Sequence, residues 1–286
     1  MNMLQQRNSG DAQKAMKIAL LLSGLPRQWN PSLGTQLNML ADHEVGVFFH
    51  FWDTIDASEK SQILELLKPL AYIFEAPKDF SSFDHDPSIL IDNINVPSRM
   101  ASQYYSWKCV GEIFTPYADQ FDFVVRARSD LQFVSSISHI FSQLKSGDVV
   151  IPWWDKEKKL LTDIFAIGDP KSMLYYHKLY DRLPEYKGES FNPEWLLMHH
   201  LLQSPIPLNV LTEENQPWYF IRRPHMQDMS LEECMKENPG RNKWLNPEVL
   251  QSSKDFYSNT SGRNAESFDS FITDQLEKLR AEKGKL

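Results

Sequence analysis

The chain has 286 residues, a length that suits one large domain or two small ones. Hydrophobic residues make up 42% and charged residues 24%, as in ordinary globular proteins, and the net charge of −8 argues against a broad nucleic-acid-binding face. The two cysteines, Cys109 and Cys234, match no metal or redox spacing, so isolated buried thiols are expected.

The N-terminal segment predicts a cytoplasmic protein. Residues 1–17 are polar and lack the apolar core of a secretory signal, and the apolar run at 18–22 is far too short to span a bilayer. We therefore expect a loose tail over 1–16, a single domain over 17–286 and no integral membrane segment.

Strands and helices are expected to alternate in the first half of the chain. Short apolar runs predict buried strands, at 17–23, 44–51 and 71–74. Helices are expected around 37–40, at 58–67 with Ser58 as the cap, and at 100–114, where apolar residues recur with helical spacing. Residues 80–97 contain several Asp and Pro and predict a loop-rich insert.

The second half continues this alternation. Strands are expected at 121–130, 148–154, 164–168, 208–211 and 218–222. Helices are expected at 170–183 and 194–202, which both follow a proline start signal, and at 268–283, an amphipathic tail helix. Alternating strands and helices predict an α/β fold with a mostly parallel sheet flanked by helices. The sequence contains no dinucleotide-binding glycine pattern and no phosphate-binding lysine loop.

The most informative stretch is 122–133, where Arg126, Arg128 and Asp130 alternate after a short apolar run. A period of two places all three side chains on one face of an extended segment. Two guanidiniums and a carboxylate need a partner that satisfies them when buried. An anionic ligand fits, held by the arginines and by a divalent cation on Asp130 that bridges a diphosphate; oxygen ligands suit Mg²⁺ or Mn²⁺. The alternative is a structural Arg–Asp network.

Other predicted strands also end in polar or aromatic side chains. Open α/β sheets bind ligands beyond the carboxyl ends of their strands, so these ends should converge on one crevice. They carry Ser23 and Gly24 with Arg27, Trp52 with Asp53, and Trp153 with Trp154. Gly24 would let a ligand approach the backbone and Arg27 would meet a phosphate, whereas a plain turn is the alternative for this segment.

Two carboxylates are candidate general bases. Asp163 precedes a predicted strand, where it could also bind a sugar hydroxyl or simply be solvated. Glu194 lies in the first turn of a predicted helix, where a favourable contact with the helix dipole is the alternative. Lys108 on the central helix is expected to face the crevice, and Arg222 could reach a diphosphate, although solvation is the commoner fate of such residues.

Zinc chemistry is disfavoured by the histidine pattern. His199 and His200 are adjacent, so on a helix they point about 100° apart and cannot both bind one metal. The sequence has no pair of histidines four residues apart of the kind that zinc enzymes use.

Five segments together resemble a loose family of small glycosyltransferase-like proteins from viruses and bacterial surface-polysaccharide loci, whose fold is of the GT-A type. The segments, which occur in the expected order, are 18–27, 47–53, 104–108, 124–131 and 163–168. The resemblance implies transfer of a sugar from a nucleotide-diphosphate sugar to a hydroxyl of a glycan, polysaccharide or glycoconjugate.

The resemblance also implies roles for individual residues. Residues 126–130 take the place of the Asp-x-Asp motif of GT-A enzymes, with Arg128 where the first Asp would be. Either Arg128 itself neutralises the diphosphate, or Asp130 holds Mn²⁺ or Mg²⁺ with waters. Glu194 is the first candidate for the base and Asp163 the second.

Ser23, Gly24 and Arg27 would line the nucleotide side of this site. The alternative function is a nucleotidyltransferase, or another nucleotide-binding protein of similar sheet order. A nucleotidyltransferase would need Asp130 and a second carboxylate to hold two metal ions.

Overall fold

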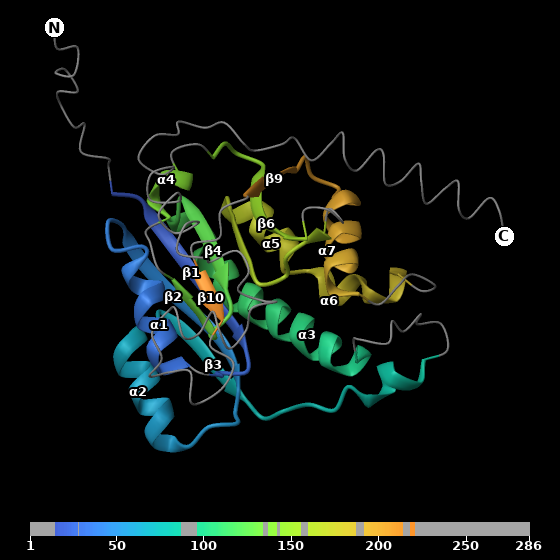
Figure 1. The fold of residues 1–286 in the computed structure, drawn as a ribbon, viewed down its shortest axis with the longest axis horizontal. Coiled ribbons are helices and arrows are strands. Elements are labelled where there is room, and N and C mark those ends of the chain that lie inside the picture. Colours follow the sequence, from blue (N-terminus) through green and yellow to red (C-terminus); the bar gives the residue numbers. More distant parts are fainter. Residues whose placement is uncertain are drawn as a thin grey trace, which may run out of the picture.

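A mixed sheet of eight strands forms the centre of the molecule, with helices on both faces (Figure 1). The strand order is β3-β2-β1-β4-β8-β6-β7, and β9 pairs with β6. The computed structural model describes residues 15–27, 29–86, 96–133, 137–141, 144–155, 160–186, 192–213 and 218–220. The predicted tail helix at 268–283 and Arg222 lie outside these ranges. No helix in the described ranges has the length and apolar character needed to cross a membrane.

One half of the sheet is parallel. It consists of β1 (Lys17–Gly24), β2 (Glu44–Trp52), β3 (Ala71–Glu75) and β4 (Phe123–Ala127). Continuous apolar runs form the inner strands because both of their faces are covered, so side chains on either face gain from burial. In β1, Ala19 and Leu21 enter one hydrophobic core, while Ile18, Leu20 and Leu22 enter the other.

The other half mixes directions. β8 (Phe165–Gly168) is antiparallel to β4 and to β6 (Asp148–Asp155). β9 (Asn209–Glu213) is parallel to β6, and β7 (Leu160–Leu161) is antiparallel to it. A separate ribbon pairs β5 (Leu131–Phe133) with β10 (Trp218–Phe220). The expected α/β fold with a mostly parallel sheet is confirmed.

The helices form two layers (Figure 1). One core receives side chains from α1 (Trp29–Asn38), α2 (Ala57–Leu67) and α4 (Ser138–Phe141). The other receives them from α3 (Pro97–Phe114), α5 (Pro170–Tyr176), α6 (Leu179–Arg182) and α7 (Pro193–Leu202). Three short 3₁₀ helices complete the described elements, at Ser81–His85, Thr115–Gln120 and Leu183–Tyr186.

Two of the predicted helix starts differ from the observed ones. α1 begins at Trp29, well before the expected helix around 37–40, because Trp29 and Leu33 bury their side chains in the core. α2 is capped by Asp56 rather than Ser58, since the Asp56 side chain accepts from the backbone N–H of Glu59 in a capping box. The Asn192 cap of α7 agrees with the predicted start signal.

Candidate functional site

The register of the parallel strands places four polar side chains on the sheet face that α3 covers. Ser23 pairs in register with His50, and Trp52 with Glu75. Arg126 pairs with Leu21, two residues before Ser23 on β1. Because side chains alternate along a strand, Ser23, His50, Glu75 and Arg126 all point toward α3. The carboxyl ends of β1, β2, β3 and β4 therefore carry a polar band on this face.

Arg126 is the buried cation of this band. Its guanidinium lies 4.2 Å from the ring centroid of Trp107 on α3, and it donates a hydrogen bond to the carbonyl of Asp163. The side chain is 0% exposed, and this burial lowers the pKa of Arg126. Arg126 thus holds the backbone just before β8. Because its guanidinium is buried, Arg126 is not accessible to a ligand.

Arg128 and Asp130 form an ion pair with each other. Arg128 Nε and Nη2 donate to the two carboxylate oxygens of Asp130 at 2.9 and 2.6 Å. The expectation that Arg126, Arg128 and Asp130 share one extended face is wrong, because β4 ends at Ala127 and the chain turns over 128–130. For Arg128 and Asp130, the geometry is that of the Arg–Asp network left open by the sequence.

Contacts from α1 and the β1 end hold this turn in place. Gln36 donates to the carbonyls of Arg128 and Leu131 at 2.7 and 2.9 Å. Ser129 donates to the carbonyl of Leu25 at 2.8 Å. The turn that carries Arg128 is therefore fixed next to the β1 end, where Gly24 has a φ of 103° that favours glycine.

The two candidate bases lie near one buried tyrosine. Asp163 accepts a hydrogen bond from Gln103 of α3. Tyr104, on the same helix, donates to the carbonyl of Pro193 at 3.2 Å, which ties α3 to the first turn of α7 beside Glu194. Burial, followed by the charges of Asp163 and Glu194, raises the pKa of Tyr104 well above its usual value. The structure thus brings both carboxylates to the same region.

Several predicted site residues have other partners. Lys108, which was expected to face the crevice, contacts Asp181 at 2.6 Å and Glu112 at 3.8 Å and so joins α3 to α6. Asp53 pairs with Lys60 of α2 at 2.5 Å.

The remaining predicted residues at the ends of β1 and β2 differ in exposure. Arg27 is exposed, whereas Trp52 is buried and stacks on Tyr105 with ring centroids 5.7 Å apart. Ser23 is buried, and its hydroxyl has no hydrogen-bond partner among the described residues. An unpaired buried hydroxyl at a strand end is unfavourable unless a ligand or water completes it.

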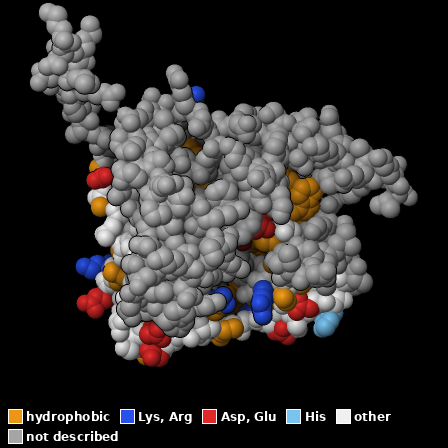
Figure 2. Space-filling model, in the orientation of Figure 1, with side chains coloured by type: hydrophobic (Ala, Val, Ile, Leu, Met, Phe, Trp, Pro, Cys, Tyr) orange, Lys and Arg blue, Asp and Glu red, His pale blue; other side chains and the backbone are white. Residues whose placement is uncertain are grey.

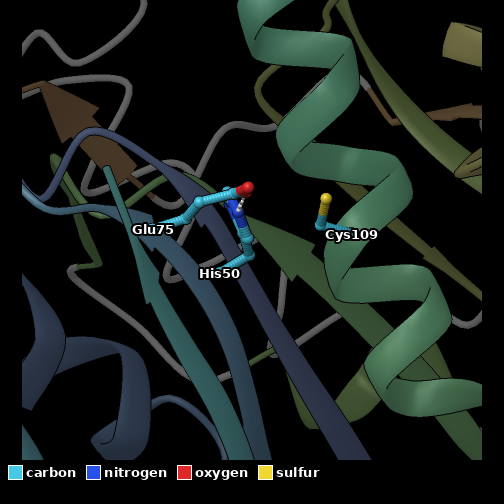
Figure 3. A group of neighbouring side chains, drawn as sticks. All are labelled: His50, Glu75 and Cys109. Carbon is cyan, nitrogen blue, oxygen red and sulfur yellow. Dashed lines mark hydrogen bonds and ion pairs between the residues drawn. The ribbon is translucent and has the colours of Figure 1, made fainter. Parts of the chain in front are cut away.

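Sequence reasoning missed a polar network at the ends of β2 and β3. His50 contacts Ser106 at 2.7 Å through Nδ1. Through Nε2 it contacts Glu75 at 2.8 Å (Figure 3). Glu75 also contacts Lys78 at 2.7 Å and accepts from Tyr105 at 3.3 Å. Burial lowers the pKa of His50. The available signal was a histidine inside the apolar run 47–52, a position where a polar side chain needs partners.

Charges on the molecular surface are mixed. Figure 2 shows Lys, Arg, Asp and Glu side chains interspersed along the lower, described part of one face.

Comparisons with known proteins find likeness in structure alone. No protein-family model matches the chain, and no curated protein matches it in sequence. The glycosyltransferase GlyE of Streptococcus pneumoniae is similar with 12% identity and a TM-score of 0.43, over 70% of this chain and 46% of that one. The chain thus spans less than half the length of GlyE.

Two further solved structures are also sugar transferases by name. A putative nucleotide-diphospho-sugar transferase of Desulfovibrio desulfuricans is 12% identical, with a TM-score of 0.40, over 80% of this chain and 97% of that one. The galactosyltransferase LgtC is 13% identical, with a TM-score of 0.43, over 64% and 70%.

Proposed function

We propose that the chain is a glycosyltransferase that moves a sugar from a nucleotide-diphosphate sugar to a hydroxyl of a carbohydrate acceptor. One observation carries this proposal: the turn with Arg128 and Asp130 is fixed against the β1 end, at the carboxyl edge of an open α/β sheet. Ligands of such sheets bind beyond this edge. Arginine at this position suits a diphosphate because its fork of N–H donors matches phosphate oxygens.

Asp130 does not provide the ligands that Mg²⁺ or Mn²⁺ would need. Both of its oxygens accept from Arg128, and the preceding alternate position, which is an acid in the Asp-x-Asp pattern, is that arginine. A divalent cation at this carboxylate would have to displace a guanidinium and would then lie beside its positive charge. We therefore propose that Asp130 binds no metal ion. We propose instead that the Arg128 guanidinium neutralises the negative charge of the diphosphate.

The proposed reaction is a displacement at the anomeric carbon. The bond from this carbon to the diphosphate oxygen breaks, and the leaving group keeps the electron pair and gains negative charge that the Arg128 guanidinium stabilises. A carboxylate takes the proton of the acceptor hydroxyl as the new bond forms. Glu194 and Asp163 are the proposed bases. Gln103 and Arg126 hold Asp163 by its side chain and its carbonyl, respectively.

Thermal unfolding in the presence of sugar nucleotides tests this function. We expect one UDP-, GDP- or dTDP-sugar to raise the melting temperature, equally with and without EDTA, because a ligand that binds only the folded chain stabilises it. A shift with nucleoside triphosphates but with no sugar nucleotide would favour the nucleotidyltransferase alternative. No shift with either class would contradict the proposal.

A further inference from the structure

Three side chains from three elements lie close together between α3 and the carboxyl ends of β2 and β3. His50 lies on β2, Glu75 ends β3, and Cys109 faces them from α3 (Figure 3). A nitrogen, an oxygen and a sulfur atom from these residues all lie within 4.8 Å of one another. His50 and Cys109 are buried and Glu75 is half-buried.

The hydrogen bonds of Ser106 select the protonation of His50. Ser106 Oγ lies 2.7 Å from His50 Nδ1 and 3.2 Å from the His50 carbonyl oxygen. A hydroxyl has one hydrogen, so both contacts are hydrogen bonds only if Ser106 donates to the carbonyl and accepts from an Nδ1–H group. In the neutral imidazole with this tautomer, Nε2 has no hydrogen and presents a lone pair.

This tautomer leaves a place for a cation between His50 and Glu75. Nε2 lies 2.8 Å from Oε2 of Glu75, so a lone pair faces a carboxylate oxygen. Two electron-rich atoms at this distance require a positive charge between them, which is either a proton or a metal ion. Cys109 supplies a third ligand atom on the α3 side of this pair.

The other oxygen of Glu75 is held separately. Oε1 contacts the Lys78 ammonium at 2.7 Å and accepts from Tyr105 at 3.3 Å, while Oε2 faces His50. Metal-bound carboxylates and imidazoles are typically oriented by such outer hydrogen bonds. Lys78 and Tyr105 would thus orient the carboxylate, and Ser106 the imidazole.

We propose that His50 Nε2, Glu75 Oε2 and Cys109 Sγ form a zinc site. A nitrogen, an oxygen and a thiolate suit Zn²⁺, whereas Mg²⁺ and Mn²⁺ prefer oxygen ligands. A neutral imidazole, a carboxylate and a thiolate balance the charge of the ion. On binding, the Cys109 thiol releases its proton to solvent, and the proton between His50 Nε2 and Glu75 Oε2 is released as well, while His50 keeps its proton on Nδ1.

Metal binding would require two small adjustments. From zinc–ligand bonds of about 2.0–2.3 Å, tetrahedral ligand atoms stand about 3.3–3.6 Å apart. His50 Nε2 and Glu75 Oε2, which are 2.8 Å apart, would therefore separate, and Cys109 Sγ would approach them from within 4.8 Å. Three protein ligands leave the fourth tetrahedral position for water or a substrate group. This site is distinct from Asp130 and does not depend on the proposed sugar transfer.

Cobalt absorption tests this site with the metal alone. We would strip the full chain with a chelator under reducing conditions, titrate it with Co²⁺, and expect one equivalent to produce a thiolate-to-cobalt charge-transfer band that Zn²⁺ abolishes. Cys109→Ser should remove this band. Cys234→Ser, which changes the other cysteine in the chain, should keep it.

Two further variants keep the test decisive if Cys109→Ser does not fold. Glu75→Gln removes a charged ligand, and Ser106→Ala removes only the group that orients His50. We expect Ser106→Ala to bind Co²⁺ about 10- to 100-fold more weakly with the charge-transfer band intact. The proposal would be overturned if the wild-type titration gave no thiolate-to-cobalt band, or if the band survived Cys109→Ser. It would also be overturned if Glu75→Gln and Ser106→Ala both bound Co²⁺ with unchanged affinity.

Discussion

The Arg128–Asp130 pair shows how two mostly buried charges at a strand end are stabilised by contact with each other. The Asp130 side chain is 5% exposed and that of Arg128 22%, so water screens the pair only in part. Two parallel hydrogen bonds fix the guanidinium plane, which orients its charge. The pair thus has a structural role, and Arg128 has in addition the proposed role toward a diphosphate.

A double-mutant cycle measures this structural role. We expect Arg128→Ala and Asp130→Ala to be coupled by about 2 kcal/mol in the free energy of unfolding, because each single change removes the two hydrogen bonds between the charges of a mostly buried pair. Urea unfolding of the four proteins gives the coupling. The control is Lys17 with Glu44, 3.8 Å apart with side chains 55% and 70% exposed, whose coupling should stay below about 0.5 kcal/mol. Equal coupling in the two pairs would refute this assignment.

At the scale of elements, two buried histidines, at the end of α5 and on α7, make the stability of the folded chain depend on pH. His177 caps the end of α5, and His200 on α7 stacks on Tyr175 with ring centroids 4.4 Å apart. Burial lowers the pKa of each to about 4, from an ordinary value of 6.5. Between pH 6.5 and 4 the unfolded chain therefore binds more protons than the folded one, so stability falls as the pH falls through this window.

We expect each buried histidine to cost roughly 3 kcal/mol of stability between pH 6.5 and pH 4. His177→Gln should reduce the slope between pH 6.5 and 5, where carboxylates stay ionised, because glutamine does not titrate and can donate to the Met173 carbonyl as His177 does. Urea unfolding at several pH values measures the slope. The control, His85→Gln, changes an exposed histidine and should leave the slope unchanged. Identical slopes for both variants would contradict the explanation.

Two glycines give opposite expectations for a single added methyl group. A Cβ on Gly46 of β2 would lie 2.5 Å from Phe121 Cζ and 2.8 Å from Leu70 Cδ1. Phe121 packs against Phe48 and Phe114, with ring centroids 5.6 and 5.8 Å away, so it cannot easily move aside. Gly46→Ala should therefore destabilise the chain by about 1–3 kcal/mol.

Gly34 of α1 is the matched control, because a Cβ there meets nothing within 4 Å. Gly34→Ala should stabilise the chain by about 0.5–1 kcal/mol, since glycine is a poor helix residue. Thermal or urea unfolding distinguishes the two variants. If both changed stability in the same direction, the packing described for β2 would be incorrect.

The sequence predicts most strands well because their signal is local. Apolar runs place β1, β2 and β3 within a residue of their observed ends. The end of β4 could not be predicted in this way. The expected strand at 121–130 ends at Ala127, because Gln36 and Ser129 hold a turn directly after it, and no local pattern shows those contacts.

At the scale of the whole molecule, the candidate sites depend on contacts between distant segments. His50, Glu75 and Cys109 come from two strands and a helix, so no spacing motif reveals them. Arg128 and Asp130 were visible as a pattern, but their ion pair follows from a turn that Gln36 and Ser129 hold. Residue types could therefore be predicted from sequence, whereas their partners could not.

Calorimetric binding of a sugar nucleotide tests the central claim most directly. We use the sugar nucleotide that raises the melting temperature most, and expect the wild-type protein to bind it equally with and without EDTA. Arg128→Ala should bind this sugar nucleotide at least about tenfold more weakly, because loss of a charge-assisted contact costs about 1.5 kcal/mol or more. Lys145→Ala, an exposed change before the amino end of β6, should bind as wild type does. Binding that requires Mn²⁺, or that Arg128→Ala leaves intact, would contradict the account.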